Sequence, residues 1–489
     1  MVGRRGDTMK KHQAVILCDL GYGDAGKGTM VDYLCRREHY EWNVRYTGGP
    51  QAAHYVVLPD DQWHLFAHFG SGTFTRGVKT LLAASTFIAP YNLLAEEELL
   101  KKKFGVGDAL ARLSIDSRAA VIMPWHKMLG RMREIARGVE RHGSCGQGVG
   151  EAVADVDSEL ALAMRDLAGG KKLFRQLRRI AEMKCAIAMI LIGEAEDRDT
   201  RWRLEQQFHH FRDAYPVDEV ADFYRGFFRR MKTNVCEQEK IIAAALANDD
   251  KLIFEGAQGA LLDPVCGFAP YVTKTRVTGM YAEAMLAGAD EMIDRKKLGI
   301  VRAYAHRHGA GPLVTEDEAL VGKIIDRHNV HNEWQGSFRF GWPDLVAMQY
   351  GLAVSGGVDC LAVTCLDQLS GLSQIKVCRG YVFHGDLRRL EELSECCDWQ
   401  RRGEDEALIS ALIASPKTVP RQMAELLFDC RPEYTEPLPG WDDDLRGVRS
   451  YGELPANARH FIDMIECELK TPVEIVSVNP TYHGKLVRI

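Results

Sequence analysis

A glycine-rich stretch near the N-terminus carries residue types that bind phosphate. Residues 18–29 read Cys-Asp-Leu-Gly-Tyr-Gly-Asp-Ala-Gly-Lys-Gly-Thr and follow an apolar run at residues 14–17. Apolar residues then recur at helical spacing over residues 30–34. A strand, a glycine loop and a helix together aim backbone N–H groups and a helix N-terminus at phosphate. We therefore expect a nucleotide-binding loop in which Lys27 supplies a point charge.

The loop is close to a Walker A motif but differs from it at one position. Gly21 to Lys27 has the G-x-x-x-x-G-K spacing, whereas Gly28 stands where Ser or Thr holds Mg²⁺. This difference disfavours an ordinary P-loop NTPase. Asp24, inside the loop, is the remaining candidate to bind a metal ion. A plain glycine turn between a strand and a helix is the alternative interpretation.

Composition excludes several classes of protein. The 489 residues carry a net charge of −6, so no general basic field favours nucleic acid as a partner. Thirteen cysteines are scattered without C-x-x-C pairs, which favours a reducing compartment over a disulfide framework. The polar N-terminus lacks the apolar core of a signal peptide, and no apolar run reaches membrane-spanning length. We expect a cytoplasmic protein with small-molecule partners.

Alternating strand and helix patterns indicate an α/β fold. We expect a mostly parallel central sheet flanked by helices, with a P-loop-like nucleotide site at the carboxyl ends of its strands. Residues 1–12 are predicted to form a flexible N-terminus and residues 13–489 one α/β domain. A Leu-, Ala-, Arg- and Glu-rich stretch at about 157–248 predicts a helical insertion, and residues 387–470 are predicted to be mainly helix and loop.

Seven motifs, beginning with part of the glycine-rich loop, occur in one order along the chain. They are Gly23-Asp-Ala-Gly-Lys-Gly28, a Gly-Gly…Ala-x-His segment ending at His54, Phe254-Glu-Gly-Ala-Gln-Gly-x-Leu-Leu-Asp263, Pro270-Tyr-Val-Thr273, Gly309-Ala-Gly-Pro312, Gly341-Trp342 with Asp344, and Thr364-x-Leu-Asp367. From about residue 13 to about residue 480 the chain resembles the adenylosuccinate synthetase family. The resemblance implies a homodimeric ligase that joins L-aspartate to IMP with GTP and Mg²⁺.

That reaction needs a carboxylate base near both the purine N1 and the transferred phosphate. The resemblance gives this role to Asp24 and makes His54 a donor to the oxygen that passes between base and phosphate. Lys27 would neutralise phosphate charge. Gln258 completes the predicted catalytic set and has the donor and acceptor needed to read a purine edge.

The resemblance also implies three binding sets. The GTP set is Gly23, Asp24, Ala25, Gly26, Lys27, Gly28, Thr29, Ala53, His54, Cys365, Asp367, Ser477 and Asn479. The substrate set is Gln51, Ser144, Cys145, Gln258, Thr273, Arg307, Ser337 and Arg339. The metal set is the Asp24 carboxylate and the Ala53 carbonyl. Asp367 can accept from the N1–H and N2–H₂ of guanine, which favours GTP over ATP.

The chain departs from the family pattern where substrates bind. No arginine stands near Ser158, where the family reaches across its dimer to the IMP phosphate. The stretch before Gly341-Trp342 keeps one arginine, Arg339, although two carboxylates ordinarily want bidentate arginine contacts. Cys365 replaces the usual lysine. Two alternatives therefore stay open: a variant ligase acting on dGMP, GMP or a modified purine nucleotide, and a non-catalytic GTP-binding regulatory protein.

Overall fold

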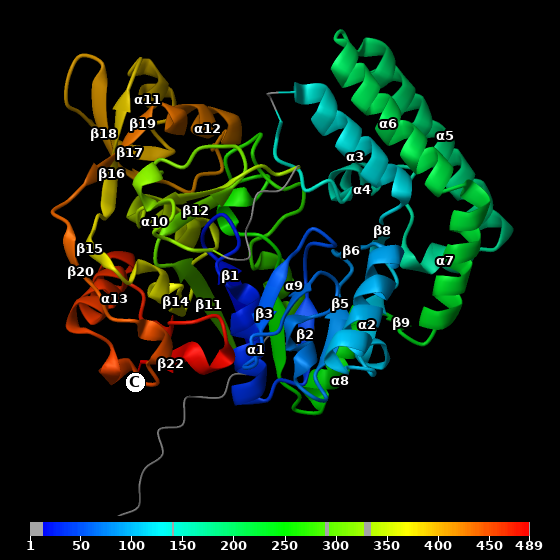
Figure 1. Cartoon of the computed structure of the whole chain (residues 1–489), viewed down its shortest axis with the longest axis horizontal. Helices are drawn as coiled ribbons and strands as arrows, with labels where there is room; N and C mark the ends of the chain where they lie inside the picture. The colour runs from blue at the N-terminus through cyan, green and yellow to red at the C-terminus, as the bar shows by residue number, and fades with distance from the viewer. Residues whose placement is uncertain (1–12, 139–140, 289–292, 327–333, 489) are drawn as a thin grey trace, which may run out of the picture.

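The computed structural model describes residues 13–138, 141–288, 293–326 and 334–488. The predicted flexible N-terminus at residues 1–12 lies outside the described residues. A large sheet crosses the middle of the molecule, and helices and smaller sheets surround it (Figure 1).

The central sheet has ten strands in the described ranges. Nine of them run parallel, and the edge strand β22 is antiparallel to β21. Their order is β22 (Lys485–Val487), β21 (Val473–Ser477), β14 (Cys360–Thr364), β11 (Arg295–Arg302), β1 (Ala14–Asp19), β10 (Leu252–Glu255), β2 (Trp42–Arg45), β5 (Lys79–Leu82), β7 (Leu113–Asp116) and β9 (Val235–Cys236). The predicted mostly parallel α/β fold is confirmed.

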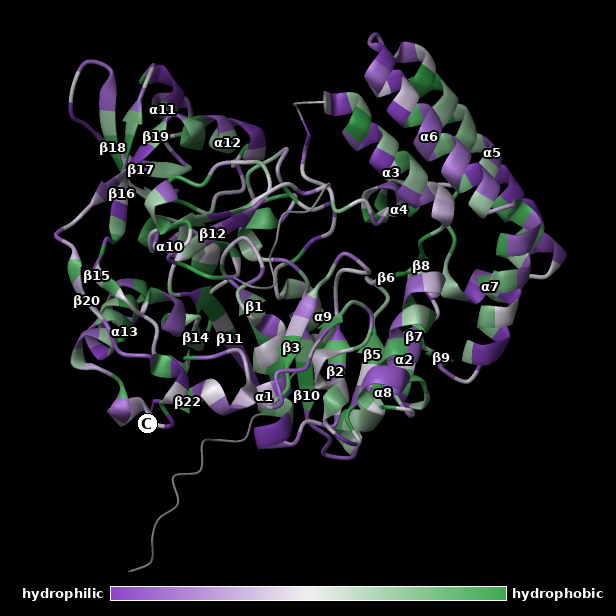
Figure 2. Cartoon of the chain, viewed as in Figure 1, coloured by the Kyte–Doolittle hydropathy of each residue, from purple (hydrophilic) through white to green (hydrophobic). Residues whose placement is uncertain are grey.

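The sheet is covered on both faces, as parallel sheets require. All six residues of β1 are buried. Ala14, Ile16 and Cys18 join one apolar cluster, whereas Val15 and Leu17 join another with helix α1 (Lys27–Glu38). Figure 2 shows apolar residues concentrated in the central strands. Further covering helices are α2 (Pro90–Phe104), α9 (Met280–Ala287), α10 (Leu345–Val354) and α13 (Ala456–Leu469).

A group of helices lies at one side of the molecule, in cyan and green in Figure 1. They are α3 (Pro124–Arg137), α4 (Val149–Asp155), α5 (Lys171–Glu194), α6 (Arg198–Ala214) and α7 (Val217–Met231). The next helix, α8 (Gln238–Ala247), belongs instead to the core of the central sheet. α3 packs against α4, α5 and α6. That the stretch 157–248 is an insertion stays a prediction. Within the described ranges, no helix combines the length and apolar character needed to cross a bilayer.

A small antiparallel sheet lies on the opposite side (Figure 1). Its order is β17 (Cys397–Arg401), β18 (Glu406–Leu412), β16 (Cys378–His384) and β19 (Cys430–Tyr434), with α11 (Arg388–Glu392) and α12 (Pro420–Phe428) beside it. The prediction of mainly helix and loop for residues 387–470 is therefore wrong at β17, β18 and β19. β16 and β18 pack on α10, and this tertiary contact stabilises short strands whose local pattern is weak.

Four two-stranded pairings complete the fold. They are β3 (His54–Val57) with β4 (Trp63–Phe66), β6 (Phe87–Ile88) with β8 (Ala120–Val121), β12 (Ala305–His308) with β13 (Phe338–Gly341), and β15 (Leu372–Ile375) with β20 (Leu438–Trp441). β3 and β12 follow strands of the central sheet and bring their first residues to its carboxyl edge.

Candidate active site

A cavity of about 1460 Å³ opens at the carboxyl ends of the central strands. Its lining comes from the loops after β1, β10, β11, β14 and β21, together with segments around residues 51–54 and 142–151. All predicted site residues line it except Ala25, Ser337 and Arg339. Loops far apart in the sequence thus meet at one place, as expected for ligand sites in open parallel sheets.

The phosphate loop is held by a carboxylate that the sequence analysis did not assign. Asp19 is the last residue of β1 and is buried. It accepts from Lys27 Nζ at 2.6 Å and from the backbone N–H groups of Gly21 and Ala25 at 3.0 and 3.3 Å. Ala25 therefore contributes to the loop through its backbone. The ion pair fixes the lysine and the loop before any nucleotide binds.

Gly28 has no room for a side chain. A Cβ built there would lie 2.7 Å from the Tyr55 carbonyl oxygen and 3.0 Å from the His54 carbonyl carbon. The first turn of α1 thus packs directly on the backbone of β3, which carries His54. This contact explains why the hydroxyl of a Walker A motif is missing from this position.

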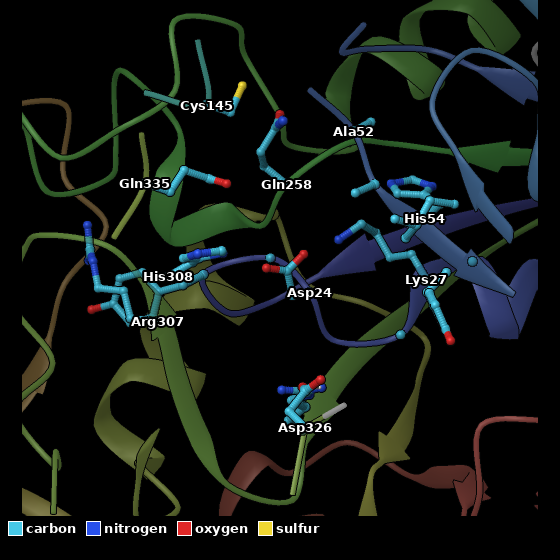
Figure 3. A pocket seen from close by; sticks show the side chains of 18 of the residues that line it. Asp24, Lys27, Ala52, His54, Cys145, Gln258, Arg307, His308, Asp326 and Gln335 are labelled. Atoms are coloured by element: carbon cyan, nitrogen blue, oxygen red, sulfur yellow. Dashed lines mark hydrogen bonds and ion pairs between the residues drawn. The ribbon is translucent and has the colours of Figure 1, made fainter. Parts of the chain in front are cut away.

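Asp24 stands at the centre of the cavity, with Gln258 and Cys145 on one side of it in Figure 3 and Lys27 on another. Its backbone is left-handed, with φ of 50°, a strained conformation for a non-glycine residue. Within the described ranges no protein group donates a hydrogen bond to its carboxylate. Enclosure raises the pKa of Asp24, and the Lys27 and Arg302 charges only partly oppose the rise. This carboxylate is suited to accept a proton.

His54 is paired with a second unassigned carboxylate, Glu255 at the end of β10. The His54 Nδ1 contacts Glu255 Oε1, and the Ser71 N–H donates to Glu255 Oε2 at 3.0 Å. Burial, together with the nearby Arg45 charge, lowers the pKa of His54 to about 4. Burial would raise the pKa of Glu255, but His54 and Arg45 lower it to about 2. The imidazole is therefore neutral, with Nδ1–H donating to Glu255.

The Nε2 atom of His54 is buried and has no hydrogen-bond partner among the described residues. It remains available to a ligand in the cavity. An anionic phosphate beside this atom would raise the pKa of His54 and favour a second N–H donor.

The predicted base-reading residues form another part of the lining. Burial raises the pKa of Asp367 to about 6, although Gln368 Nε2 donates to its Oδ2 at 2.8 Å. Ser477 Oγ donates to the Asn479 carbonyl at 3.1 Å, and Asn479 Oδ1 accepts from the Thr481 N–H. Asp367 is thus a half-buried acceptor that would gain from two N–H donors of a guanine.

Uncharged groups dominate the part of the cavity that we predict to bind the second nucleotide. Both polar side-chain atoms of Gln51 and the Oε1 of Gln258 are buried without a partner among the described residues. The Ser144 Oγ accepts from the Gly146 N–H at 3.2 Å. Burial raises the pKa of the Cys145 thiol, which stays neutral. Lys274, an exposed lining residue next to Thr273, is a cation that the sequence analysis missed.

The two arginines of the predicted substrate set are largely engaged by other groups of the protein. Arg307 is 1% exposed and donates to the carbonyls of residues 310, 312 and 271. Arg339 pairs with Glu316 through two nitrogens and donates to the carbonyls of residues 309 and 311. Arg307 lines the cavity, whereas Arg339 and Ser337 do not.

The site fits a metal ion that takes most of its ligands from a bound nucleotide. No group of three or more His, Cys, Asp or Glu side chains in the described ranges is arranged to hold a metal. Asp24 offers a carboxylate that has no hydrogen-bond partner among the described residues, and Ala53 is exposed in the cavity beside His54. Hard oxygen donors of this kind suit Mg²⁺, which is usually bound by one or two protein groups plus phosphate oxygens.

Comparisons with known proteins agree with this geometry. The profile of the family described as Adenylosuccinate synthetase matches residues 16–484. The adenylosuccinate synthetase of Clostridium beijerinckii is 32% identical over 472 residues, covering 96% of this chain and 97% of that protein. The enzyme of that name from Halothermothrix orenii is 31% identical, covering 94% and 95%.

Two solved structures share the fold. The fully ligated adenylosuccinate synthetase of Plasmodium falciparum superposes with a TM-score of 0.77 at 21% identity, covering 98% of this chain and 100% of that one. The succinoaminodeoxyadenylate synthetase of cyanophage S-2L, bound to dGMP and to dATP as an energy donor, gives 0.52 at 14% identity, covering 98% and 96%.

Proposed function

The chain belongs to the adenylosuccinate synthetase family, and from this premise we propose how its residues carry out the reaction of such a ligase. The enzyme uses GTP to phosphorylate the 6-oxo group of a purine nucleoside monophosphate, and L-aspartate then displaces the phosphate. The observation that carries the residue assignment is the position of Asp24, an unpartnered carboxylate between Lys27 and Gln258 in one large cavity.

Asp24 acts as the base in the first step. Its carboxylate takes the proton from N1 of the purine, and the resulting negative charge on O6 attacks the γ-phosphorus of GTP. The bond from that phosphorus to the β,γ-bridging oxygen breaks, and GDP leaves. In the second step the amine of L-aspartate attacks C6, inorganic phosphate leaves, and a proton of the amine is released. The raised pKa of Asp24 favours the first proton transfer.

Lys27 and His54 stabilise the transferring phosphoryl group. Lys27 is buried and held by Asp19, so its ammonium needs no reorientation when charge develops. The unpartnered Nε2 of His54 donates to a phosphate oxygen once the triphosphate has raised the pKa of the imidazole. Glu255 keeps the ring in position through Nδ1 and stabilises the imidazolium.

Mg²⁺, held by the Asp24 carboxylate and the Ala53 carbonyl, would neutralise charge on the triphosphate oxygens when bound. Asp367 accepts from N1–H and N2–H₂ of guanine and so selects GTP, with Ser477 and Asn479 on the other side of the base. Gln51, Ser144, Cys145, Gln258 and Thr273 hold the monophosphate nucleotide. We also propose the homodimer that the family resemblance implies; light scattering would report twice the chain mass of 54.8 kDa.

The decisive experiment mixes the protein with IMP, GTP, Mg²⁺ and L-aspartate. We expect a rise in absorbance at about 280 nm, because a 6-amino-substituted purine replaces a 6-oxo purine, together with stoichiometric GDP. A panel of purine monophosphates, read by product mass spectrometry, identifies the preferred nucleotide. If no 6-oxo purine monophosphate gives a succinyl adduct, the proposal is wrong. Tight GTP binding without turnover would instead favour the regulatory alternative.

A further inference from the structure

A buried ion pair in the cavity has no role in the reaction described above. Arg302 is the last residue of β11 and is 9% exposed. Its Nη2 lies 2.8 Å from Asp326 Oδ2, and both residues line the cavity. The Nε and Nη1 atoms of Arg302 have no hydrogen-bond partner among the described residues. Leaving such donors buried and unsatisfied costs free energy, so this guanidinium is poised for an acceptor that the described residues do not supply.

The position of Arg302 follows from the strand order. β11 lies between β1, which ends at the phosphate loop, and β14, which ends before Asp367. Arg302 is in register with Thr364, whose Oγ1 donates to the Ala25 carbonyl of the phosphate loop at 2.8 Å. Arg302 therefore stands between the residues predicted to bind phosphate and the carboxylate predicted to read guanine. The phosphate chain of a nucleoside triphosphate must cross this gap.

The effect of the Arg302 charge on nearby carboxylates indicates the same position between the phosphate loop and Asp367. Burial raises the pKa of Asp24 and of Asp367, and in both cases the Arg302 charge opposes the rise. One cation thus acts on the two carboxylates at the two ends of the proposed GTP site. Figure 3 shows Asp326 on the side of Asp24 away from Gln258 and Cys145, so the ion pair lies away from the proposed monophosphate site.

Contacts with two aromatic rings also restrict the orientation of the Arg302 guanidinium. Its Cζ lies 5.0 Å from the centroid of the Tyr304 ring and 5.6 Å from that of Phe338. With Asp326 holding Nη2, these ring contacts leave Nε and Nη1 in a fixed orientation. A fixed arginine fork matches the oxygens of a phosphate better than a flexible ammonium does.

We propose that Arg302 binds the phosphate chain of the nucleoside triphosphate through Nε and Nη1, and that Asp326 is a positioning residue for it. This inference rests on the proposed function for the identity of the ligand. Lys27 is already paired with Asp19, so a further donor group close to the triphosphate has a clear purpose.

The test measures binding alone, by calorimetry of a non-hydrolysable GTP analogue and of guanosine. Arg302→Gln should lower the affinity for the analogue by about 30-fold and the affinity for guanosine by less than about threefold, since only the analogue carries the phosphates. Asp326→Asn should lower the affinity for the analogue by only about threefold, because it loosens the hold on the arginine but keeps the guanidinium charge. The matched control is Arg295→Gln, at the opposite, exposed end of β11, which should change neither affinity.

Three outcomes would overturn the assignment: unchanged analogue affinity in Arg302→Gln, equal losses for guanosine and the analogue, or equal losses in Arg302→Gln and Asp326→Asn. The last is the result expected of a purely structural ion pair. If Arg302→Gln does not fold, as judged by its melting transition, Arg302→Lys is measured instead. That variant must lower the affinity for the analogue more than the affinity for guanosine. Because no turnover is measured, a failure here is distinct from a failure to form the succinyl adduct.

Discussion

The two ends of the cavity hold their polar groups in different ways. At the end that we propose to bind the triphosphate, Lys27 is paired with Asp19 and His54 with Glu255, and both carboxylates end neighbouring strands of the sheet. At the substrate end, Gln51 and Gln258 keep polar atoms without partners among the described residues. Ion pairs orient the side chains of the first end before a ligand binds, and leave His54 Nε2 and the Nε and Nη1 atoms of Arg302 for the ligand. At the second end, both polar atoms of Gln51 await hydrogen bonds from a ligand.

This difference indicates where chemistry and specificity reside. Groups fixed by the sheet stabilise a transition state without reorganising, so changes there should lower kcat. Groups that are satisfied only by a substrate act in ground-state binding, so changes there should raise KM. The following variants test that division.

The largest effect is expected from Asp24→Asn. The amide keeps the size of the side chain but cannot accept the N1 proton, so kcat should fall by about 10³-fold. Steady-state rates with IMP, GTP and L-aspartate measure it, and a thermal melt checks the fold. A variant with undiminished kcat would mean that another group is the base.

Glu255→Gln should lower kcat by about 10- to 100-fold with little change in either nucleotide KM, because it weakens the hold on His54 and the stabilisation of its protonated form. The matched control is Glu96→Gln. Glu96 is also a buried carboxylate beside histidines, His64 and His68, but it does not line the cavity. That variant should lose stability and keep kcat. Equal losses of kcat in both variants would show a general packing effect.

Lys274→Met should raise the KM for the nucleoside monophosphate about fivefold and leave kcat and the KM for GTP unchanged. The lysine is exposed, so its attraction to the substrate phosphate is modest and screened by salt. The difference in this KM between the variant and the unaltered enzyme should therefore become smaller as ionic strength rises. A fall in kcat instead would place Lys274 in the phosphoryl-transfer step.

The smallest predicted effect concerns how the free energy of unfolding depends on pH. His306 Nε2 donates to the Gly23 carbonyl at 2.5 Å, and burial lowers the pKa of His306 to about 3. The unfolded chain binds a proton near pH 6.5 and the folded chain does not. The contribution of His306 to the free energy of unfolding is therefore fully present above pH 6.5. Below that pH it falls by about 1.4 kcal/mol per pH unit.

His306→Gln keeps a donor near Gly23 and removes this titration. Urea unfolding at pH 7.5 and pH 5.5 should show a smaller loss of stability on acidification in the variant than in the unaltered protein. The same loss in both would mean that His306 does not titrate in this interval.

Much of the triphosphate end could be predicted from the sequence because its signals are local. Residues 21–28 combine glycines, Asp24 and Lys27 within one loop, and all of these except Gly21 line the cavity. Asp19, Glu255 and Arg302 were not assigned, since each is simply the last residue of a strand. Their importance arises only when β1, β10 and β11 lie side by side.

Long-range pairing also explains the other differences. Arg339 was predicted to bind substrate, but it pairs with Glu316, 23 residues away, and this partner cannot be read from spacing. The strands β17 to β19 were missed because their pairings contain shifts in register and because contacts distant in the sequence, such as that of β18 with α10, stabilise them. The α/β class was easier to recognise, since parallel strands buried on both faces are continuous apolar runs.

The close fit of Gly28 against the backbone of β3 has an evolutionary consequence. Restoring the Walker hydroxyl by a single Gly→Ser exchange would push α1 away from the strand that carries His54. Descent from this loop to a conventional ATPase therefore requires several coordinated changes, and the histidine and the glycine should be inherited together.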